Sequence, residues 1–183
     1  MPHRDALEDG APSDLSPDLA PIAAELERPD GPEGLGGWLL LVGLGVVTQP
    51  LILVVFVFTT FLPVLRDGTW EQLTSPGSPD YTPMFAPLVG FELLTNVVLF
   101  VLSVVVLVLF FRKSRRFPTL YVIMVVGSLA VVTLDALLVS WVFPSVDAFD
   151  LSTVESIVQE AVRAAIWVPY MYVSDRVKNT FVH

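Results

Sequence analysis

The chain contains no cysteine, and its only histidines, His3 and His183, stand at its two ends. The missing thiols exclude disulfides, cysteine nucleophiles and zinc or iron–sulfur sites with cysteine ligands. Without a histidine or cysteine in the interior of the sequence, no nucleophile–base pair is available, and a metal site is not expected. The residue inventory therefore predicts no cofactor and no catalytic constellation, which favours a protein that is not an enzyme.

Charged residues are also scarce. They make up 16% of the 183 residues, whereas hydrophobic residues make up 54%, and the mean hydropathy is +0.68. A soluble domain is about 25% charged, and a domain of this size still exposes roughly a third of its chain surface. Because so many apolar side chains cannot be hidden in one small globule, the composition excludes an ordinary soluble enzyme and predicts an integral membrane protein.

The net charge of -9 is concentrated near the N-terminus. Residues 1–36 hold nine acidic residues against Arg4 and Arg28, together with six of the 15 prolines. Low hydrophobicity, proline and like charge leave too little apolar surface to offset the entropy of folding. Residues 1–35 are therefore predicted to form a disordered acidic tail. The same acidity argues against nucleic acid as a partner, because nucleic-acid binding needs a concentrated basic surface.

Four apolar segments follow the tail, at about 37–62, 88–111, 118–143 and 153–173. A helix needs about 20 apolar residues to cross a hydrocarbon core of about 30 Å. The fourth segment is weaker, because Glu155, Glu160 and Arg163 interrupt it. The sequence predicts an all-α protein in which residues 36–182 form an integral membrane four-helix bundle.

The basic residues predict the orientation of this bundle. Four of the ten bases lie between Phe111 and Phe117, and Arg176 and Lys178 follow the fourth segment. Loops rich in lysine and arginine stay in the cytoplasm, so both termini are predicted to be cytoplasmic. The same count favours a crossing by the fourth segment, because a surface helix would leave the basic C-terminus outside.

Two capping patterns predict where helices begin between the spans. Thr69-Trp-Glu-Gln72 fits a capping box for a short helix in the loop after the first span. Ser152-Thr-Val-Glu155 fits a second capping box, which would open the fourth helix.

Several polar residues fall inside the predicted spans, where they are costly and therefore informative. These residues are Glu92, Asn96, Asp135, Gln159, Glu160 and Arg163. An arginine at this depth should be paired, either with Glu160 one turn away or with Asp135 or Glu92 on another helix. Two interpretations stay open: a structural salt bridge between helices, or a hydrated cavity facing the outside that holds a titratable acid.

Two prolines within the spans predict bends. Pro50 cannot donate a hydrogen bond to the carbonyl of Val46, and Gln49 is the local donor that could replace it. A packing kink is favoured over a ligand site there. Pro169 likewise frees the carbonyl of Ala165 near the cytoplasmic end of the fourth helix.

Aromatic and basic residues mark the predicted membrane interface. Trp38, Trp167 and Tyr170 lie where amphipathic rings prefer to anchor a helix among headgroups. Basic residues on the cytoplasmic side should contact anionic lipid; these residues are Arg112, Lys113, Arg115, Arg116, Arg176 and Lys178. The alternative for this basic surface is the docking of a protein partner.

Three stretches resemble a known family. They are Gly36-Gly-Trp-Leu-Leu40, Phe110-Phe-Arg-Lys with Phe117-Pro118, and Ile166-Trp-Val-Pro-Tyr170 followed by Ser174-Asp-Arg-Val-Lys-Asn-Thr-Phe181. The chain is similar, over about residues 34–182, to an uncharacterised bacterial family catalogued as domain of unknown function 2569. The resemblance implies a small inner-membrane protein with four helices, and it implies no reaction.

The leading functional hypothesis is therefore a non-enzymatic accessory or scaffold protein of the bacterial inner membrane. Its expected partners are the lipid bilayer and another membrane protein. The alternative is a small transporter or ligand-binding membrane protein that uses the polar cluster of the outer leaflet.

Overall fold

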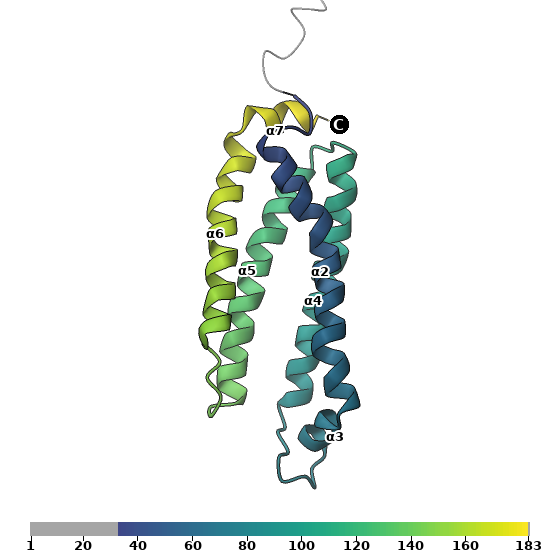
Figure 1. Cartoon of the computed structure of the whole chain (residues 1–183), viewed down its shortest axis with the longest axis vertical. Helices are drawn as coiled ribbons and strands as arrows, with labels where there is room; N and C mark the ends of the chain where they lie inside the picture. The colour runs from purple at the N-terminus through teal and green to yellow at the C-terminus, as the bar shows by residue number, and fades with distance from the viewer. Residues whose placement is uncertain (1–32, 183) are drawn as a thin grey trace, which may run out of the picture. The chain divides into compact units, whose positions relative to one another are not determined.

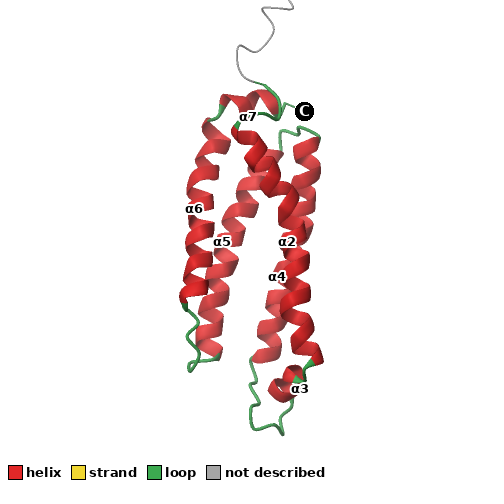
Figure 2. Cartoon of the chain, in the orientation of Figure 1, coloured by secondary structure: helices red, strands yellow, loops and turns green. Residues whose placement is uncertain are grey.

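The computed structural model describes residues 33–182, and its regular elements in that range are all helices (Figures 1 and 2). Four helices are long: α2 (Trp38–Arg66), α4 (Phe85–Phe111), α5 (Phe117–Val142) and α6 (Leu151–Val173). Two are short: α3 (Thr69–Thr74) and α7 (Asp175–Thr180). The all-α prediction is confirmed for these residues. The predicted acidic tail falls almost wholly outside the part of the chain that the structure describes.

The long helices lie side by side in chain order. α2 packs on α4, α4 on α5 and α5 on α6. One end of the array holds α7, the start of α2 and the 112–116 loop, and we call it the α7 end; the opposite end holds α3, and we call it the α3 end (Figure 1). The α2–α4 pair and the α5–α6 pair are close at the α7 end and diverge toward the α3 end (Figure 1).

Among the described residues, three helices are long and apolar enough to cross a membrane: α2, α4 and α5. They have 29, 27 and 26 residues, or about 40 Å each at the rise of an α-helix. Many of their apolar side chains are exposed in the isolated chain, as expected for surfaces that face lipid. These three helices show that the chain is a membrane protein. α6 has 23 residues, and its polar side chains make it less apolar.

The buried core lies mainly at the α7 end, where aromatic rings pack together. Phe117 of α5 stacks on Phe181, which follows α7, with ring centroids 4.4 Å apart, and Phe110 of α4 packs against both rings. Buried residues from α2, α4, α5, α6 and α7 surround them: Leu39, Val42, Val46, Val106, Tyr121, Met124, Val125, Met171 and Val177. Close van der Waals packing of this kind is what holds helices together in lipid. The α7 end is therefore the firmly packed half of the molecule.

Both predicted capping boxes are wrong in detail, although both helices exist. α6 begins two residues earlier than predicted, and its cap is Asp150, whose carboxylate accepts the N–H of Thr153 at 2.8 Å. The hydroxyl of Ser152 donates to the same carboxylate. An aspartate is a stronger acceptor than a serine hydroxyl, and these two bonds lower the pKa of Asp150 below its usual 3.8. At the start of α3 the cap is Gly68, and Asp67 before it accepts the N–H of Thr69 at 3.0 Å.

α2 contains two prolines, Pro50 and Pro63. The helix continues through Pro50, and within the described residues Gln49 makes no side-chain hydrogen bond. The hydroxyl of Thr48 instead donates to the carbonyl of Leu44 at 3.0 Å. α2 also runs past Pro63 to Arg66, because a proline removes only its own N–H and the N–H of Asp67 still donates to the Pro63 carbonyl at 2.9 Å.

A glycine in α2 allows the close approach of an aromatic ring. A Cβ atom at Gly43 would lie 2.8 Å from Cζ of Phe110, whereas a Cβ at Gly45 would meet nothing within 4 Å. Phe110 is only 3% exposed and is enclosed by other rings, so it has no room to move away.

We therefore expect Gly43→Ala to lower stability by about 1–3 kcal/mol through overpacking. Gly45→Ala is the matched control and should be neutral or slightly stabilising, because alanine favours the helix. Thermal unfolding of the purified variants in detergent measures both. Equal melting temperatures for the two variants would contradict the packing described here.

Candidate functional site

The polar residues within the long helices fall into two groups. The carboxyl groups of Glu92, on α4, and Asp135, on α5, are close enough to interact. Nearer the α7 end, Arg163 of α6 forms an ion pair with Glu160, with Nη1 3.0 Å from Oε1. The guanidinium group of Arg163 also lies near the hydroxyl of Tyr121 on α5. The predicted polar cluster thus exists as two separate sites, an acidic pair and an ion pair.

This arrangement decides between the partners predicted for Arg163. Among residues 33–182, no ion pair joins Arg163 to Asp135 or to Glu92. The salt bridge is therefore local to α6, between residues three apart, and the expectation of a bridge between helices is wrong. Both side chains of the pair remain about a quarter exposed, 25% for Arg163 and 24% for Glu160.

One face of α5 connects the two groups. Tyr121, Ser128 and Asp135 are spaced seven residues apart, which is two helical turns, so they form a column on one face. Tyr121 lies at the end of this column next to the ion pair, and Asp135 lies at the other end, in the acidic pair. Ser128, between them, is only 9% exposed.

Three buried oxygen atoms in this region have no hydrogen-bond partner within the described chain. They are Oγ of Ser128, Oδ1 of Asp135 and Oε2 of Glu160. Buried polar atoms in folded proteins are nearly always paired, with the protein itself, with water or with a ligand. These three atoms, two on α5 and one on α6, are therefore oxygens that no described residue of this chain satisfies.

The remaining polar residues of α6 form an exposed flank. Ser152, Glu155 and Gln159 follow i, i+3, i+7 spacing on one face of the helix, and all three are exposed. Gln159 donates to the Glu155 carboxylate at 2.9 Å. We call these three residues the α6 polar flank. The neighbouring flank carries Val154, Val158 and Val162 instead, so α6 has a polar side and an apolar side.

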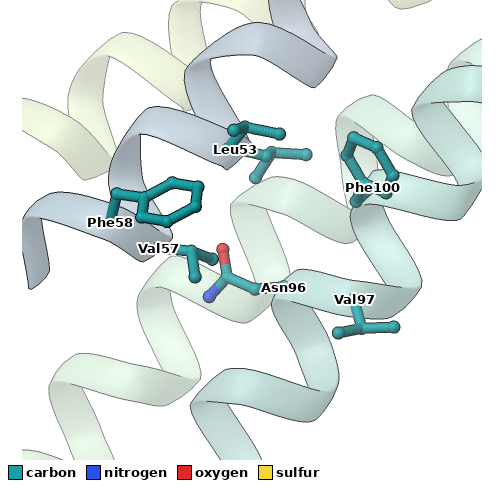
Figure 3. Close-up of a pocket in the computed structure, with 7 residues that line it drawn as sticks. Leu53, Val57, Phe58, Asn96, Val97 and Phe100 are labelled. Carbon is teal, nitrogen blue, oxygen red and sulfur yellow. The ribbon is translucent and has the colours of Figure 1, made fainter. Parts of the chain in front are cut away.

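Asn96 belongs to a different surface. Its amide donates to the carbonyl of Glu92 at 2.9 Å, and its side chain lines a shallow groove between α2 and α4 (Figure 3). The other residues that line this groove, of about 190 Å³, are apolar: Leu53, Val54, Val57, Phe58, Val97 and Phe100. Asn96 is thus satisfied by its own helix, and it does not join the acidic pair.

The α7 end gathers all six predicted basic residues near the aromatic core. Two of them donate to backbone carbonyls: Arg115 to that of Val182 at 2.7 Å, and Arg176 to that of Glu33 at 3.0 Å. Arg112, Lys113 and Arg116 are exposed in the loop, and Lys178 is exposed on α7. Lys113 has a φ of 50°, which is unusual for a residue other than glycine.

The predicted interface aromatics contact one another at the same end. The rings of Trp38 and Trp167 lie 6.4 Å apart and join the start of α2 to α6, and Tyr170 packs 5.7 Å from Trp167. Pro169 lies inside α6 beside them. These rings are therefore packing residues of the α7 end as well as candidates for contact with headgroups.

The sequence analysis missed two residues of the site, Tyr121 and Ser128. Tyr121 lies seven residues before Ser128, and Ser128 lies seven residues before Asp135. This regular spacing was the signal that could have found them. No group of three or more acidic, histidine or cysteine side chains in residues 33–182 could hold a metal ion. The site can bind donors at its free carboxyl oxygens, and the residues that compose it include no nucleophile–base pair.

The family model for a protein of unknown function, DUF2569, matches residues 32–182. The chain belongs to the DUF2569 family. No curated protein and no solved structure matches this DUF2569 chain. The matched residues include both polar groups, the α6 polar flank and the basic α7 end.

A double-mutant cycle tests the ion pair of this DUF2569 protein. Glu160→Gln or Arg163→Ala leaves the other charge, whose side chain is only about a quarter exposed, without its partner, so each should cost about 2 kcal/mol of stability. The double variant should cost clearly less than the sum of the two. Thermal unfolding in lipid nanodiscs gives the coupling energy.

The matched control is the pair Lys178–Asp175, also three residues apart, whose side chains are 58% and 79% exposed. Its coupling should stay below about 1 kcal/mol, because water screens it. Similar coupling energies for the two pairs would mean that Arg163 and Glu160 lie in water.

Proposed function

We propose that this protein is a four-span protein of the bacterial cytoplasmic membrane that acts as a non-enzymatic accessory or scaffold component. In this proposal the four long helices form the membrane bundle, and the α7 end lies in the cytoplasm with both termini. The length and apolar character of α2, α4 and α5 already indicate a membrane protein. The proposal adds that α6 also crosses the membrane, that the α7 end is cytoplasmic, and that a partner protein binds.

The path of the chain supports a crossing by α6. α5 and α6 pack side by side, and the bond from Arg115 to Val182 brings the loop before α5 next to the residues after α7. If α5 crosses the bilayer from that loop, α6 must cross back to bring Val182 to the same side. The moderate hydropathy of α6 does not oppose this, because its polar side chains gather on one side of the helix.

Charge supports the orientation. Six basic residues lie at the α7 end, against Arg66 alone among the described residues at the α3 end. Acidic residues predominate there instead, including Asp67, Glu71, Asp147 and Asp150. Positive loops remain in the cytoplasm, and basic side chains near the surface gain roughly 1 kcal/mol each from anionic lipid. The α7 end accordingly fits the cytoplasmic face.

Single cysteines test this topology, because the natural chain has none. We expect Ser145→Cys to react with a membrane-impermeant maleimide added outside intact cells. Ser114→Cys and Val182→Cys should react only after permeabilisation. Labelling of Val182→Cys from outside, together with Ser145→Cys, would show that α6 does not cross.

The observation that carries the accessory function is the α6 polar flank. Ser152, Glu155 and Gln159 are exposed in the isolated chain, and a crossing by α6 would place Glu155 and Gln159 against lipid, where uncovered polar groups are costly. A second membrane protein that covers this flank removes the cost. The absence of a nucleophile–base pair in the sequence agrees with a role through contacts rather than chemistry.

Site-specific photocrosslinking tests this function. We expect a photoreactive amino acid at position 159 to form a discrete protein adduct in native membranes. The same amino acid at Val158 is the control, since that residue lies at nearly the same depth, points about 100° around the helix and is 53% exposed. It should label only lipid.

Two outcomes would count against the accessory role. Equal adducts at positions 158 and 159 would show no preference for the polar flank. No protein adduct at position 159, combined with reaction of Gln159→Cys with a hydrophilic thiol reagent from outside, would show that water covers the flank. That second result would favour the alternative of a small transporter or ligand-binding protein, which the unpaired oxygens of Ser128, Asp135 and Glu160 also support.

A further inference from the structure

Two side chains of the α6 polar flank keep hydrogen-bonding groups that the described chain does not use. The amide of Gln159 donates to Oε1 of Glu155 at 2.9 Å, which occupies one N–H and one carboxylate oxygen. The other carboxylate oxygen of Glu155, and the carbonyl and second N–H of Gln159, have no partner among residues 33–182. Ser152 differs, because its hydroxyl already donates to the Asp150 carboxylate at 2.9 Å. The part of the flank that still needs a partner is therefore the Glu155–Gln159 pair.

The charge of this pair has no counterpart in the described chain. Glu155 and Gln159 are both exposed, and the ion pairs within residues 33–182 do not include Glu155. Arg66 is the only described base at the α3 end, where α6 begins. A group that covers Glu155 must therefore bring its own positive charge, and charge complementarity indicates a lysine or an arginine.

The depth of the pair indicates a helix rather than a lipid headgroup. Gln159 lies four residues beyond Glu155, or about 6 Å farther from the start of α6. If α6 crosses the membrane, the ammonium group of a lipid can meet Glu155 near the surface, but it leaves the amide of Gln159 in hydrocarbon without a partner. A helix packed along α6 can present one side chain to each of them, because residues four apart lie on one face of a helix.

A second copy of this chain does not meet the same requirement. Copies inserted in the same direction would pack around a two-fold axis along the membrane normal, which brings each residue of α6 level with itself. The amides of two Gln159 side chains can pair in this way, but the two Glu155 carboxylates would then repel each other. The occupant that the charges favour is therefore a different protein.

We propose that the partner presents a transmembrane helix with a lysine or arginine level with Glu155 and an amide or hydroxyl side chain level with Gln159. This inference rests on the accessory function proposed above and names the chemistry of the partner. The cation binds the free carboxylate oxygen of Glu155, and the polar side chain one turn away completes the hydrogen bonds of Gln159. The neighbouring flank, with Val154, Val158 and Val162, then remains against lipid.

Model transmembrane peptides test the proposal without knowledge of the natural partner. The full chain, labelled with a fluorophore at Ser145→Cys, is reconstituted in vesicles of phosphatidylcholine, whose headgroup cannot donate a hydrogen bond. Labelled leucine–alanine helices carry lysine near one end and asparagine four residues deeper, and a matched peptide carries norleucine in place of lysine. Energy transfer measures association, and we expect the lysine peptide to associate about fivefold more tightly.

Matched variants show whether the Glu155–Gln159 pair is responsible. Glu155→Gln should abolish the preference for lysine, and Glu155→Lys should reverse it in favour of a peptide with glutamate at that position. Gln159→Leu should remove the advantage of asparagine over leucine in the peptide. Glu71→Gln is the control, because it removes an exposed carboxylate from α3 instead of α6, and it should leave both preferences intact. Circular dichroism and melting temperatures verify that each variant folds.

Three results would overturn the proposal. The first is equal association of the lysine and norleucine peptides, and the second is a lysine preference that survives Glu155→Gln. The third is loss of the preference when phosphatidylethanolamine replaces phosphatidylcholine, which would show that a lipid ammonium group satisfies Glu155. A protein adduct at position 159 in native membranes alongside any of these results would leave the accessory function standing.

Discussion

The rest of the structure depends on one constraint, which is that a polar group in hydrocarbon needs a hydrogen-bond partner. Most hydroxyl groups in the long helices meet it locally. Thr48, Thr59, Thr95, Ser103 and Thr133 each donate to a backbone carbonyl three or four residues earlier. These bonds let hydroxyl side chains lie in a membrane helix at little cost. Against this background, the unpaired oxygens of Ser128, Asp135 and Glu160 stand out as the places where the chain does not satisfy itself.

The two halves of the molecule meet this constraint differently. At the α7 end, the rings of Phe110, Phe117 and Phe181 pack closely, and Arg115 and Arg176 donate to the backbone carbonyls of Val182 and Glu33. Toward the α3 end the helix pairs diverge (Figure 1), and the polar side chains there face one another or remain exposed. A firm end of this kind fixes the directions of the helices.

The sequence predicted the helices well and their contacts poorly, for a physical reason. The length of an apolar run sets the length of a spanning helix, so the predicted segments agree closely with α2, α4, α5 and α6. The partner of Arg163 depends instead on the rotation and tilt of α5 and α6, which the aromatic packing at the α7 end determines. That packing relies on Phe181, far from the site in the sequence. Asp150 was overlooked as a cap because the serine two residues later fitted the pattern equally well.

The moderate hydropathy of α6 follows from the same constraint. A helix surrounded by lipid must be apolar on all sides, but a helix with a partner needs apolar residues only where it meets lipid. Val154, Val158 and Val162 supply that surface, whereas Glu155 and Gln159 lie on the other side. Average hydropathy combines the two sides and therefore undervalues a span of this kind. Under the proposed function, the least apolar long helix is the one that a partner would recognise, and its polar residues follow from that role.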